Sequence, residues 1–448
     1  MGLNKLNGHR EPVDIVIANG IVLTMDSGKT VLEGGSVVIQ GGAIIAVKPG
    51  EVLEGRFQAR ETIEAAGKIV MPGLVNTHTH AAMTLFRGLA DDLPLQEWLE
   101  GHIWPSEAKH MSAEAVRLGT QLAIAEMIRA GTTTFNDMYL FEEEVAEMAR
   151  QAGIRAVVGE GLLDFPTPNH QTPQEGLQYA ERLIEKWRHD PFVTVAVAPH
   201  SCYACSPDIL KAARALADRH RVPLHIHLSE TKEEVAEIRG KYGFTPVAHL
   251  ENLGVLGGTV VAAHCIHLTE EDMDLIVRRR VGVAHNPESD MKLASGVAPI
   301  PALLAAGARV GLGTDGAASN NDLDMFGEMD TAAKIHKVFL RDPTVMDAPG
   351  VMEMATMGGA RVLGMEGRIG SLEKGKRADV IILDLNRPHL VPLYHPYSQV
   401  VYAAGREDVE TVIVEGRVVM RGRKLLTIEE EKVIREVRAW AGRIRTNS

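Results

Sequence analysis

The stretch Met71-Pro-Gly-Leu-Val-Asn-Thr-His-Thr-His80 decides the fold, because it ends a short apolar segment with two histidines two residues apart. Residues 70–75 predict a buried strand with a Pro-Gly break inside it. In an extended strand, positions i and i+2 point to the same side, so His78 and His80 can reach one metal ion. A lone His-x-His pair is more often two ordinary strand-end histidines. The sequence therefore predicts a metal site only if other strand ends supply further ligands.

The composition is that of an ordinary soluble globular protein: of 448 residues, 45% are hydrophobic and 24% charged. This length predicts one large domain and a smaller one. A formal net charge of −12 argues against nucleic acid or an anionic membrane as a partner. The N-terminus, with Asn4, Lys5 and His9 among few apolar residues, lacks the apolar segment of a signal peptide, and no run approaches membrane-spanning length. Because three cysteines make no disulfide framework, we expect a reducing, cytoplasmic location.

Both ends of the chain predict β-structure. Asn19-Gly20 and Gly41-Gly42 each lie between short apolar runs, which is typical of hairpin turns, and Glu415-Gly416 repeats the pattern. Because neither end has enough strands to be stable alone, we expect residues 1–70 and 373–448 to form one β-sandwich. The strands expected there cover residues 13–24 (as two strands), 37–40, 43–47, 378–383 and 409–420, and a helix over 428–445 closes the chain.

Residues 71–372 alternate between predicted strands and predicted helices. Eight strands, each followed by a helix, over about 300 residues are typical of a (β/α)8 barrel. A doubly wound open sheet is the alternative, but no G-x-G-x-x-G follows an early strand. After the strand that ends at His78 and His80, the expected strands cover residues 132–137, 154–160, 193–200, 222–228, 259–264, 281–286 and 309–315. Expected helices include 112–129, 142–151, 174–187, 209–219 and 300–306.

Metal-binding and proton-exchanging side chains recur where the predicted barrel strands end, which is where such barrels place their active sites. Alternation within 222–228 puts His225 and His227 on one face, with His227 nearer the strand end and the better ligand. His225, one layer deeper, is expected to be a packed core residue. Glu230 follows just past the strand, where it can lean over the barrel mouth. The side chains at the predicted strand ends are His78, His80, Asp137, Glu160, His200, His225, His227, His264, Asn286 and Asp315.

Three imidazoles and one carboxylate suit Zn²⁺ or Fe²⁺ and leave a coordination position open for chemistry. Such a metal lowers the pKa of a bound water to about 7. A two-metal version would need a bridging lysine at the end of the fourth strand, but no lysine occurs from Trp187 to Leu210. We therefore expect one divalent metal per chain, most plausibly Zn²⁺.

Other metal-competent residues are expected to have no part in the site. Cys202 and Cys205 form an isolated C-x-x-C, without the second pair of a zinc site or the Pro-Cys-x-x-Cys signature of cytidine-type deaminases. His267 is expected to cap the following helix or to lie on the surface. Four further histidines are interpreted as structural or exposed: His102, His110, His170 and His395.

Several motifs together resemble the amidohydrolase superfamily over essentially the whole chain, including the split β-sandwich. They are Pro72-Gly-Leu-Val-Asn-Thr-His-Thr-His80, His227-Leu-Ser-Glu230, His264-Cys-Ile-His-Leu268, His285-Asn-Pro287 and Gly313-Thr-Asp-Gly316. Three more resemble the methylthioadenosine/S-adenosylhomocysteine deaminases: the run from His80 to Asp92, Trp104-Pro-Ser-Glu107, and Gly313 to Asn321.

This resemblance implies metal-dependent hydrolytic deamination of the adenine ring of 5′-methylthioadenosine or S-adenosylhomocysteine, giving the inosine analogue and ammonia. It implies a purine nucleoside as the small-molecule partner and a homo-oligomer. The metal ligands would be His78, His80, His227 and Asp315. Glu230 would handle the proton at the purine ring, and His264 would hold the attacking water, with Asp315 as a third catalytic group. Substrate contacts would come from Glu107 at the ribose hydroxyls, His200 at the purine, and Glu230, Asp315 and Ser319.

Two other functions stay open. A relative acting on guanine or a triazine would share the barrel and metal, but a ribose-free substrate has no use for Glu107. A non-catalytic barrel is disfavoured because all four ligands and Glu230 are present.

The family's arginines that hold the carboxylate of S-adenosylhomocysteine follow the third barrel strand, yet residues 159–180 contain no arginine or lysine. The acidic residues there are Glu160, Asp164 and Glu175, and the apolar ones include Leu162, Leu163 and Phe165. We therefore expect 5′-methylthioadenosine, or an adenosine with another small uncharged 5′ group, to be preferred.

Overall fold

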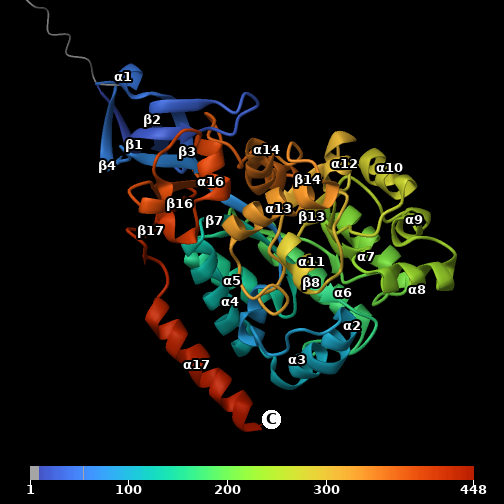
Figure 1. The fold of residues 1–448 in the computed structure, drawn as a ribbon. Helices are drawn as coiled ribbons and strands as arrows, with labels where there is room; N and C mark the ends of the chain where they lie inside the picture. The colour runs from blue at the N-terminus through green and yellow to red at the C-terminus, as the bar shows by residue number, and fades with distance from the viewer. Residues whose placement is uncertain (1–9, 54, 448) are drawn as a thin grey trace, which may run out of the picture.

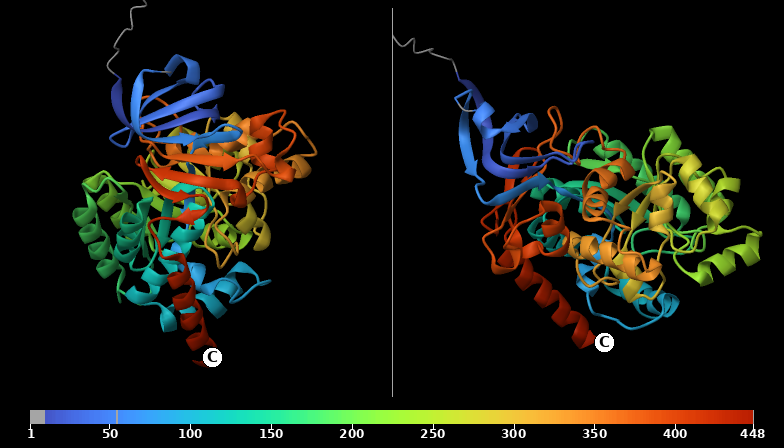
Figure 2. Two further views of the ribbon diagram at one scale, coloured as in Figure 1. Left: turned by 90° about the vertical axis from the view of Figure 1, so that its left-hand side faces the viewer. Right: turned by 45° about the horizontal axis from the view of Figure 1, so that its top comes forward.

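The structure is a computed structural model that describes residues 10–53 and 55–447. Residues 1–9, on which the expected lack of a signal peptide depends, lie outside the described residues. Strands from both ends of the chain lie side by side at one end of the molecule (Figure 1), and the two further views of Figure 2 agree. From this end α17 (Glu430–Asn447) runs past α4 (Ala113–Arg129).

Nine strands form one sheet in which N-terminal and C-terminal segments are neighbours. The link is β5 (Lys68–Pro72), which is parallel to β1 (Glu11–Leu23) on one side and antiparallel to β15 (Val380–Asp384) on the other. The expectation that both ends of the chain form one β-structure is therefore confirmed. The remaining strands are β2 (Val31–Gln40), β3 (Ala43–Pro49), β4 (Phe57–Glu64), β16 (Val409–Val414), β17 (Arg417–Arg421) and β18 (Lys424–Leu425).

Two local predictions for this sheet are wrong. Residues 13–24 form no hairpin, because Asn19, with a φ of 64°, makes an irregularity inside the single long strand β1. Gly20 follows, and a Cβ there would lie 2.6 Å from Val70 Cγ2, so glycine at this position lets β1 pack closely against β5. A short helix, α1 (Gly50–Leu53), also interrupts a segment expected to be all β. The hairpins at Gly41-Gly42 and Glu415-Gly416 are confirmed.

The stretch Met71–His80 forms two strands rather than one. β5 ends at Pro72, and β6 (Leu74–Thr79) begins after Gly73. Val70 faces the core of the terminal sheet, whereas its neighbours on β5 face the larger core shared with the barrel strands. The division into residues 1–70, 71–372 and 373–448 stays a proposal, and β5 spans its first boundary.

Between these segments, eight strand positions follow one another in the order of the expected (β/α)8 barrel. They form two parallel sheets whose edges meet at two seams. At one seam Val197 pairs with Leu224, and at the other the N–H of Asp315 donates to the C=O of His78 at 3.0 Å. After β6 the strands are β7 (Thr132–Tyr139), β8 (Arg155–Leu162), β9 (Val193–Val195) with β10 (Ala198–Pro199), β11 (Leu224–Leu228), β12 (Val260–His264), β13 (Gly282–His285) and β14 (Arg309–Leu312). The fourth position is thus split, although one strand over 193–200 was expected.

Helices surround these strands (Figure 1), and those expected from the sequence agree with the structure to within two residues at each end. None of the helices in the described part of the chain is long and apolar enough to cross a membrane. Besides α4 they are α5 (Glu142–Ala152), α6 (Pro173–Trp187), α7 (Pro207–His220), α8 (Lys232–Tyr242), α9 (Pro246–Asn252), α10 (Glu270–Arg279), α11 (Pro287–Lys292), α12 (Ile300–Ala305), α13 (Met325–Leu340), α14 (Ala348–Glu353), α15 (Gly359–Val362) and α16 (Pro396–Tyr402).

Arg155 ties the barrel strands to the terminal sheet. Its side chain is 1% exposed at the start of β8 and donates to Asp379 at 3.1 Å and to Glu415. It also donates to the C=O of Pro191 at 2.9 Å. Asp379 directly precedes β15 and Glu415 lies in the turn after β16, so one buried cation holds two carboxylates of the other unit.

We expect Arg155→Met to lower the free energy of unfolding by about 3 kcal/mol, because Asp379 would be left buried without its cation. This loss is at the lower end of the range for removing one partner of a buried ion pair, because Arg377 still pairs with Glu415 in the variant. Urea unfolding followed by circular dichroism measures the effect. Arg117→Met is the control: Arg117 is half exposed and pairs with Glu144 at the surface, so its loss should cost under about 1 kcal/mol. Equal losses in the two variants would contradict the role given to Arg155.

Candidate active site

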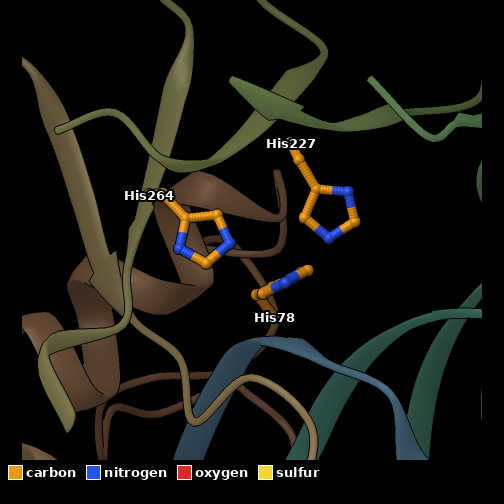
Figure 3. A group of neighbouring side chains, drawn as sticks. All are labelled: His78, His227 and His264. Atoms are coloured by element: carbon orange, nitrogen blue, oxygen red, sulfur yellow. The ribbon is translucent and has the colours of Figure 1, made fainter. Parts of the chain in front are cut away.

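Four side chains from three strand ends converge at one point. The Nε2 atoms of His78 and His80, on and just after β6, each lie 3.2 Å from Asp315 Oδ1. The Nε2 of His227, on β11, lies 3.3 Å from the Nε2 of His80. In Figure 3 the rings of His78 and His227 point toward each other and toward His264 of β12. The sequence motifs thus meet in space as expected.

Each of the three imidazoles is held through its other ring nitrogen. His227 Nδ1 donates to the C=O of His200 at 2.8 Å, and His80 Nδ1 donates to the C=O of Met138. His78 Nδ1 lies 2.9 Å from His225 Nε2, deeper in the barrel. These contacts fix the orientation of each ring and leave Nε2 for the centre. The interpretation of His225 as a buried, hydrogen-bonded core residue is confirmed.

Asp315 is oriented by two hydroxyl groups. Ser289 and Ser319 each donate to its Oδ2 at 2.7 Å, which leaves Oδ1 for the imidazoles. Ser319 was expected to contact substrate; it lines the cavity and also supports this carboxylate. Gly313 leaves space beneath the Asp315 carboxylate, because a Cβ at this position would lie 2.5 Å from Asn286 Oδ1.

The charges of this cluster suit a cation. Burial lowers the pKa of His78 to about 4 and that of His227 well below its usual value, so both rings are neutral. Burial raises the pKa of Asp315, but the adjacent His78 and His80 outweigh this and hold it well below its usual value. Burial lowers the pKa of His80 as well, but the adjacent Asp315 outweighs burial and raises that pKa above its usual value. Metal binding requires a carboxylate and neutral imidazoles, so His80 would release a proton when a cation binds.

The buried Nε2 of His78 finds no hydrogen-bond partner among the described residues. Two imidazole nitrogens of His80 and His227 also face each other at 3.3 Å. A cation between these atoms satisfies all of them at once, whereas hydrogen bonds within the cluster do not. The cluster therefore has the donor atoms and the arrangement that suit a divalent metal ion.

Glu230 and His264 lie beside the cluster as a pair. His264 Nε2 is 3.7 Å from Glu230 Oε2, and both side chains are buried. Burial raises the pKa of Glu230 to about 7, although His264 opposes the shift. Burial lowers the pKa of His264, but Glu230 and Asp290 outweigh it and raise that pKa to about 10. This arrangement can hold and move protons near neutral pH.

Left-handed backbone occurs at or just after several strand ends, for example at Ser229, His264 and Asp315, with φ of 53°, 71° and 59°. Such a conformation costs a non-glycine residue roughly 1–2 kcal/mol. Neighbouring hydrogen bonds compensate, for example those from the N–H groups of Ser229 and Glu230 to the buried carboxylate of Glu234. The sharp turns bring the side chains at the strand ends into the cavity.

One cavity opens from the cluster toward solvent. It is lined by the expected substrate residues Glu107, His200, Glu230, Asp315 and Ser319, together with His80, His227 and His264. The segment after β6, with α2 (Leu95–Trp98) and α3 (Trp104–His110), supplies much of an apolar wall. Among the described lining residues none is lysine or arginine. Burial raises the pKa of Glu107 to about 7, although the neighbouring Tyr139 opposes the shift.

Some expected strand-end residues do not reach this cavity. Asp137 accepts the N–H of Ala81 at 2.7 Å, and Glu160 accepts from the N–H of Glu142 and from Asn169. Both lie inside their strands rather than at the ends, so their carboxylates face neighbouring segments. His267 is no helix cap, since α10 is capped by Thr269; its Nε2 donates to the C=O of Ser295 at 2.8 Å.

Sequence reasoning missed three supporting residues: Ser289 and Asp290 on α11, and Glu234 on α8. The signals present, Asn286-Pro287 and Thr231-x-x-Glu234, predict helix starts. They do not reveal that the first turns of these helices bend back over the strand ends.

Comparisons with known proteins agree with this geometry. Residues 69–419 match the Amidohydrolase family. A 5-methylthioadenosine/S-adenosylhomocysteine deaminase of Syntrophobacter fumaroxidans is 55% identical over 96% of this chain and 98% of that protein. A 5′-deoxyadenosine deaminase of Methanothermobacter thermautotrophicus is 47% identical over 86% of this chain and 90% of that protein. The zinc-bound crystal structure of an adenosine deaminase from Xanthomonas campestris is 43% identical, with a TM-score of 0.96 over 98% of this chain and 100% of that one.

The chain belongs to the amidohydrolase family, whose pattern it matches over more than three quarters of its length. Within this family it belongs to the methylthioadenosine/S-adenosylhomocysteine deaminases, as the resemblance of its motifs implied.

We expect His227→Ala to lose its bound divalent metal, because the variant removes one of the converging Nε2 atoms. Metal content after gel filtration measures this. His170→Ala is the control, since His170 is also buried but contacts Thr167 outside the cluster, and this variant should keep its metal. Full metal content in the His227 variant would show that the cluster is not the metal site.

Proposed function

We propose that this protein catalyses hydrolytic deamination of the adenine ring of nucleosides with a small uncharged 5′ group, such as 5′-methylthioadenosine or 5′-deoxyadenosine. Water adds its oxygen to C6 of the ring, the bond from C6 to the amino nitrogen breaks, and ammonia leaves. The observation that carries this proposal is that a single cavity joins the metal cluster and Glu230 to Glu107 and an apolar wall. A homo-oligomeric, cytoplasmic enzyme stays a prediction.

His78, His80, His227 and Asp315 would hold one metal ion, which we propose is Zn²⁺. The three imidazoles and one carboxylate form a ligand set typical of zinc. A divalent cation here supplies Lewis-acid chemistry, which makes water acidic enough to be a nucleophile near neutral pH.

Glu230 and His264 would manage the protons. Glu230 has a pKa of about 7, so it can carry a proton to the ring nitrogen N1 and make C6 electrophilic. His264 would direct an N–H from Nε2 toward the attacking oxygen, and Asp315 would accept a proton during attack. His200, whose pKa burial lowers to about 3, is neutral and would contact the purine edge.

Glu107 and the apolar wall would select the rest of the nucleoside. Glu107 lies on α3, on the loop side of the cavity, where a carboxylate can accept hydrogen bonds from the two ribose hydroxyls. Leu163, Phe165 and Trp104 line the same cavity, and the rings of Trp104 and Phe165 lie 5.0 Å apart. An uncharged 5′ group fits such surroundings.

Ammonia release from a panel of compounds tests the proposal: adenosine, 5′-deoxyadenosine, 5′-methylthioadenosine, S-adenosylhomocysteine, adenine, guanine and a chlorotriazine. We expect turnover of the nucleosides with small 5′ groups. If only guanine or the triazine were turned over, the protein would be a hydrolase of a ribose-free heterocycle, which has no use for Glu107, and the proposal would be wrong.

Chelation should abolish activity, and one equivalent of Zn²⁺ or Fe²⁺ per chain should restore it, because one ligand set is present in the cavity and no lysine bridges it. Titration of the metal-free protein, with ammonia release as the readout, measures the stoichiometry. A requirement for two tightly bound ions would contradict the single-metal site.

Glu230→Gln should keep the metal and the fold but lower kcat by roughly 10²–10⁴-fold, since a general acid–base group is removed without touching a ligand. Metal analysis and steady-state kinetics check both parts. Glu160→Gln is the matched control, because Glu160 is a buried glutamate with a pKa also raised to about 7 by burial, yet it lies outside the cavity. A near-normal kcat in the Glu230 variant would show that another residue transfers the proton to the ring nitrogen N1.

The kcat/KM for 5′-methylthioadenosine should exceed that for S-adenosylhomocysteine by about tenfold or more. The physical reason is that a carboxylate finds no lysine or arginine among the described lining residues, and one charge-assisted contact is worth roughly 1.5–3 kcal/mol. The acidic residues of the loop contribute less than expected, since Glu160 faces Glu142 and Asn169, and Asp164 accepts the N–H of Ser206.

Phe165→Arg and Phe165→Gln sharpen this test. The arginine should shift the ratio toward S-adenosylhomocysteine, whereas glutamine, which is polar but uncharged, should not. If S-adenosylhomocysteine were equal or better with the parent protein, the assignment of the 5′ wall would be wrong.

A further inference from the structure

Asp290 lies behind His264, on the side away from the cavity. It is on α11, the short helix that begins directly after β13, and its side chain is 2% exposed. Its Oδ1 lies 2.8 Å from His264 Nδ1, the shortest of the contacts recorded for that ring.

This contact requires a proton on Nδ1 of His264. The Nδ2 of Asn286 also lies 3.3 Å from His264 Nδ1, but an amide nitrogen can only donate. An ionised carboxylate can only accept, so the shorter contact requires a hydrogen on Nδ1. The Nε2 atom is then the one that faces the cavity, 3.7 Å from Glu230.

The helix that carries Asp290 also contacts the metal cluster. The other oxygen of Asp290, Oδ2, lies 3.7 Å from His285 Nδ1, which is too far for a hydrogen bond, and it has no hydrogen-bond partner among the described residues. The preceding residue, Ser289, donates to Asp315. One turn of α11 therefore orients both the carboxylate of the metal cluster and the imidazole beside it.

We propose that Asp290 is a positioning residue that acts through His264, keeping the proton on Nδ1 and aiming Nε2 at the oxygen that attacks the substrate. This inference rests on the proposed deamination. Without the carboxylate, the ring of His264 can rotate about its side-chain bonds, so fewer molecules hold the productive arrangement.

A double-mutant cycle tests this role with Asp290→Asn, His264→Gln and the two combined. Asp290→Asn alone should lower kcat at least tenfold, with KM and metal content unchanged. In the His264→Gln background, Asp290→Asn should lower kcat less than twofold, because the imidazole through which Asp290 acts is absent. An equal fold-loss in both backgrounds would overturn the proposal, since it would mean that Asp290 supports the fold or another residue.

Asp272→Asn is the matched control. Asp272 is 1% exposed, completes the capping box of α10 with Thr269 and lies outside the cavity. Asp272→Asn should therefore lower stability, and its effect on kcat should be the same with and without His264.

Nitrogen NMR of the histidine rings in the parent protein needs neither substrate nor a stable Asp290 variant. The signals that His264→Gln removes should include a protonated Nδ1 in strong hydrogen bonding, and an unprotonated Nδ1 would overturn the proposal. A protonated Nδ1 in a protein that releases no ammonia from any nucleoside would instead refute the proposed function alone.

Discussion

The structure depends on keeping three imidazoles and one carboxylate together in the protein interior. Burial keeps the rings of His78 and His227 uncharged, and hydrogen bonds at Nδ1 point the Nε2 atoms of His78, His80 and His227 at Asp315. The seam between the first and last barrel strands lies at the same place, since the N–H of Asp315 bonds the C=O of His78. The contact between the first and last barrel strands and the cluster of candidate ligands therefore involve the same two residues.

The rest of the chain supports this point. β5 belongs to the terminal sheet, where it pairs with β15, and the chain runs from it directly into β6, the first barrel strand. The terminal sheet is therefore connected to the strand that carries His78 toward the site. The segment after β6 returns as α2 and α3 to wall the cavity. The first turns of α8 and α11 bend back over the strand ends, where Glu234, Ser289 and Asp290 hold functional groups in place.

Much of this was predictable from the sequence because the signals are local. Alternation within 222–228 predicted that His227 is the better candidate ligand and that His225 lies behind it, and βα alternation predicted the barrel. The hairpin at Asn19-Gly20 failed because the same dipeptide also permits an irregularity inside a long strand, and only the partner Val70 decides between them. Asp290 could not be predicted because its role depends on where α11 lies after folding, and Glu160 was misassigned because its strand continues two residues further.

The most direct test of this account is a crystal structure of the metal-loaded protein with the inosine analogue of 5′-methylthioadenosine, using anomalous scattering to locate the ion. The account predicts one ion bound by His78, His80, His227 and Asp315, with Glu230 at the ring nitrogen N1 and Glu107 at the ribose hydroxyls. An ion elsewhere, or a ring whose N1 lies away from Glu230, would contradict it.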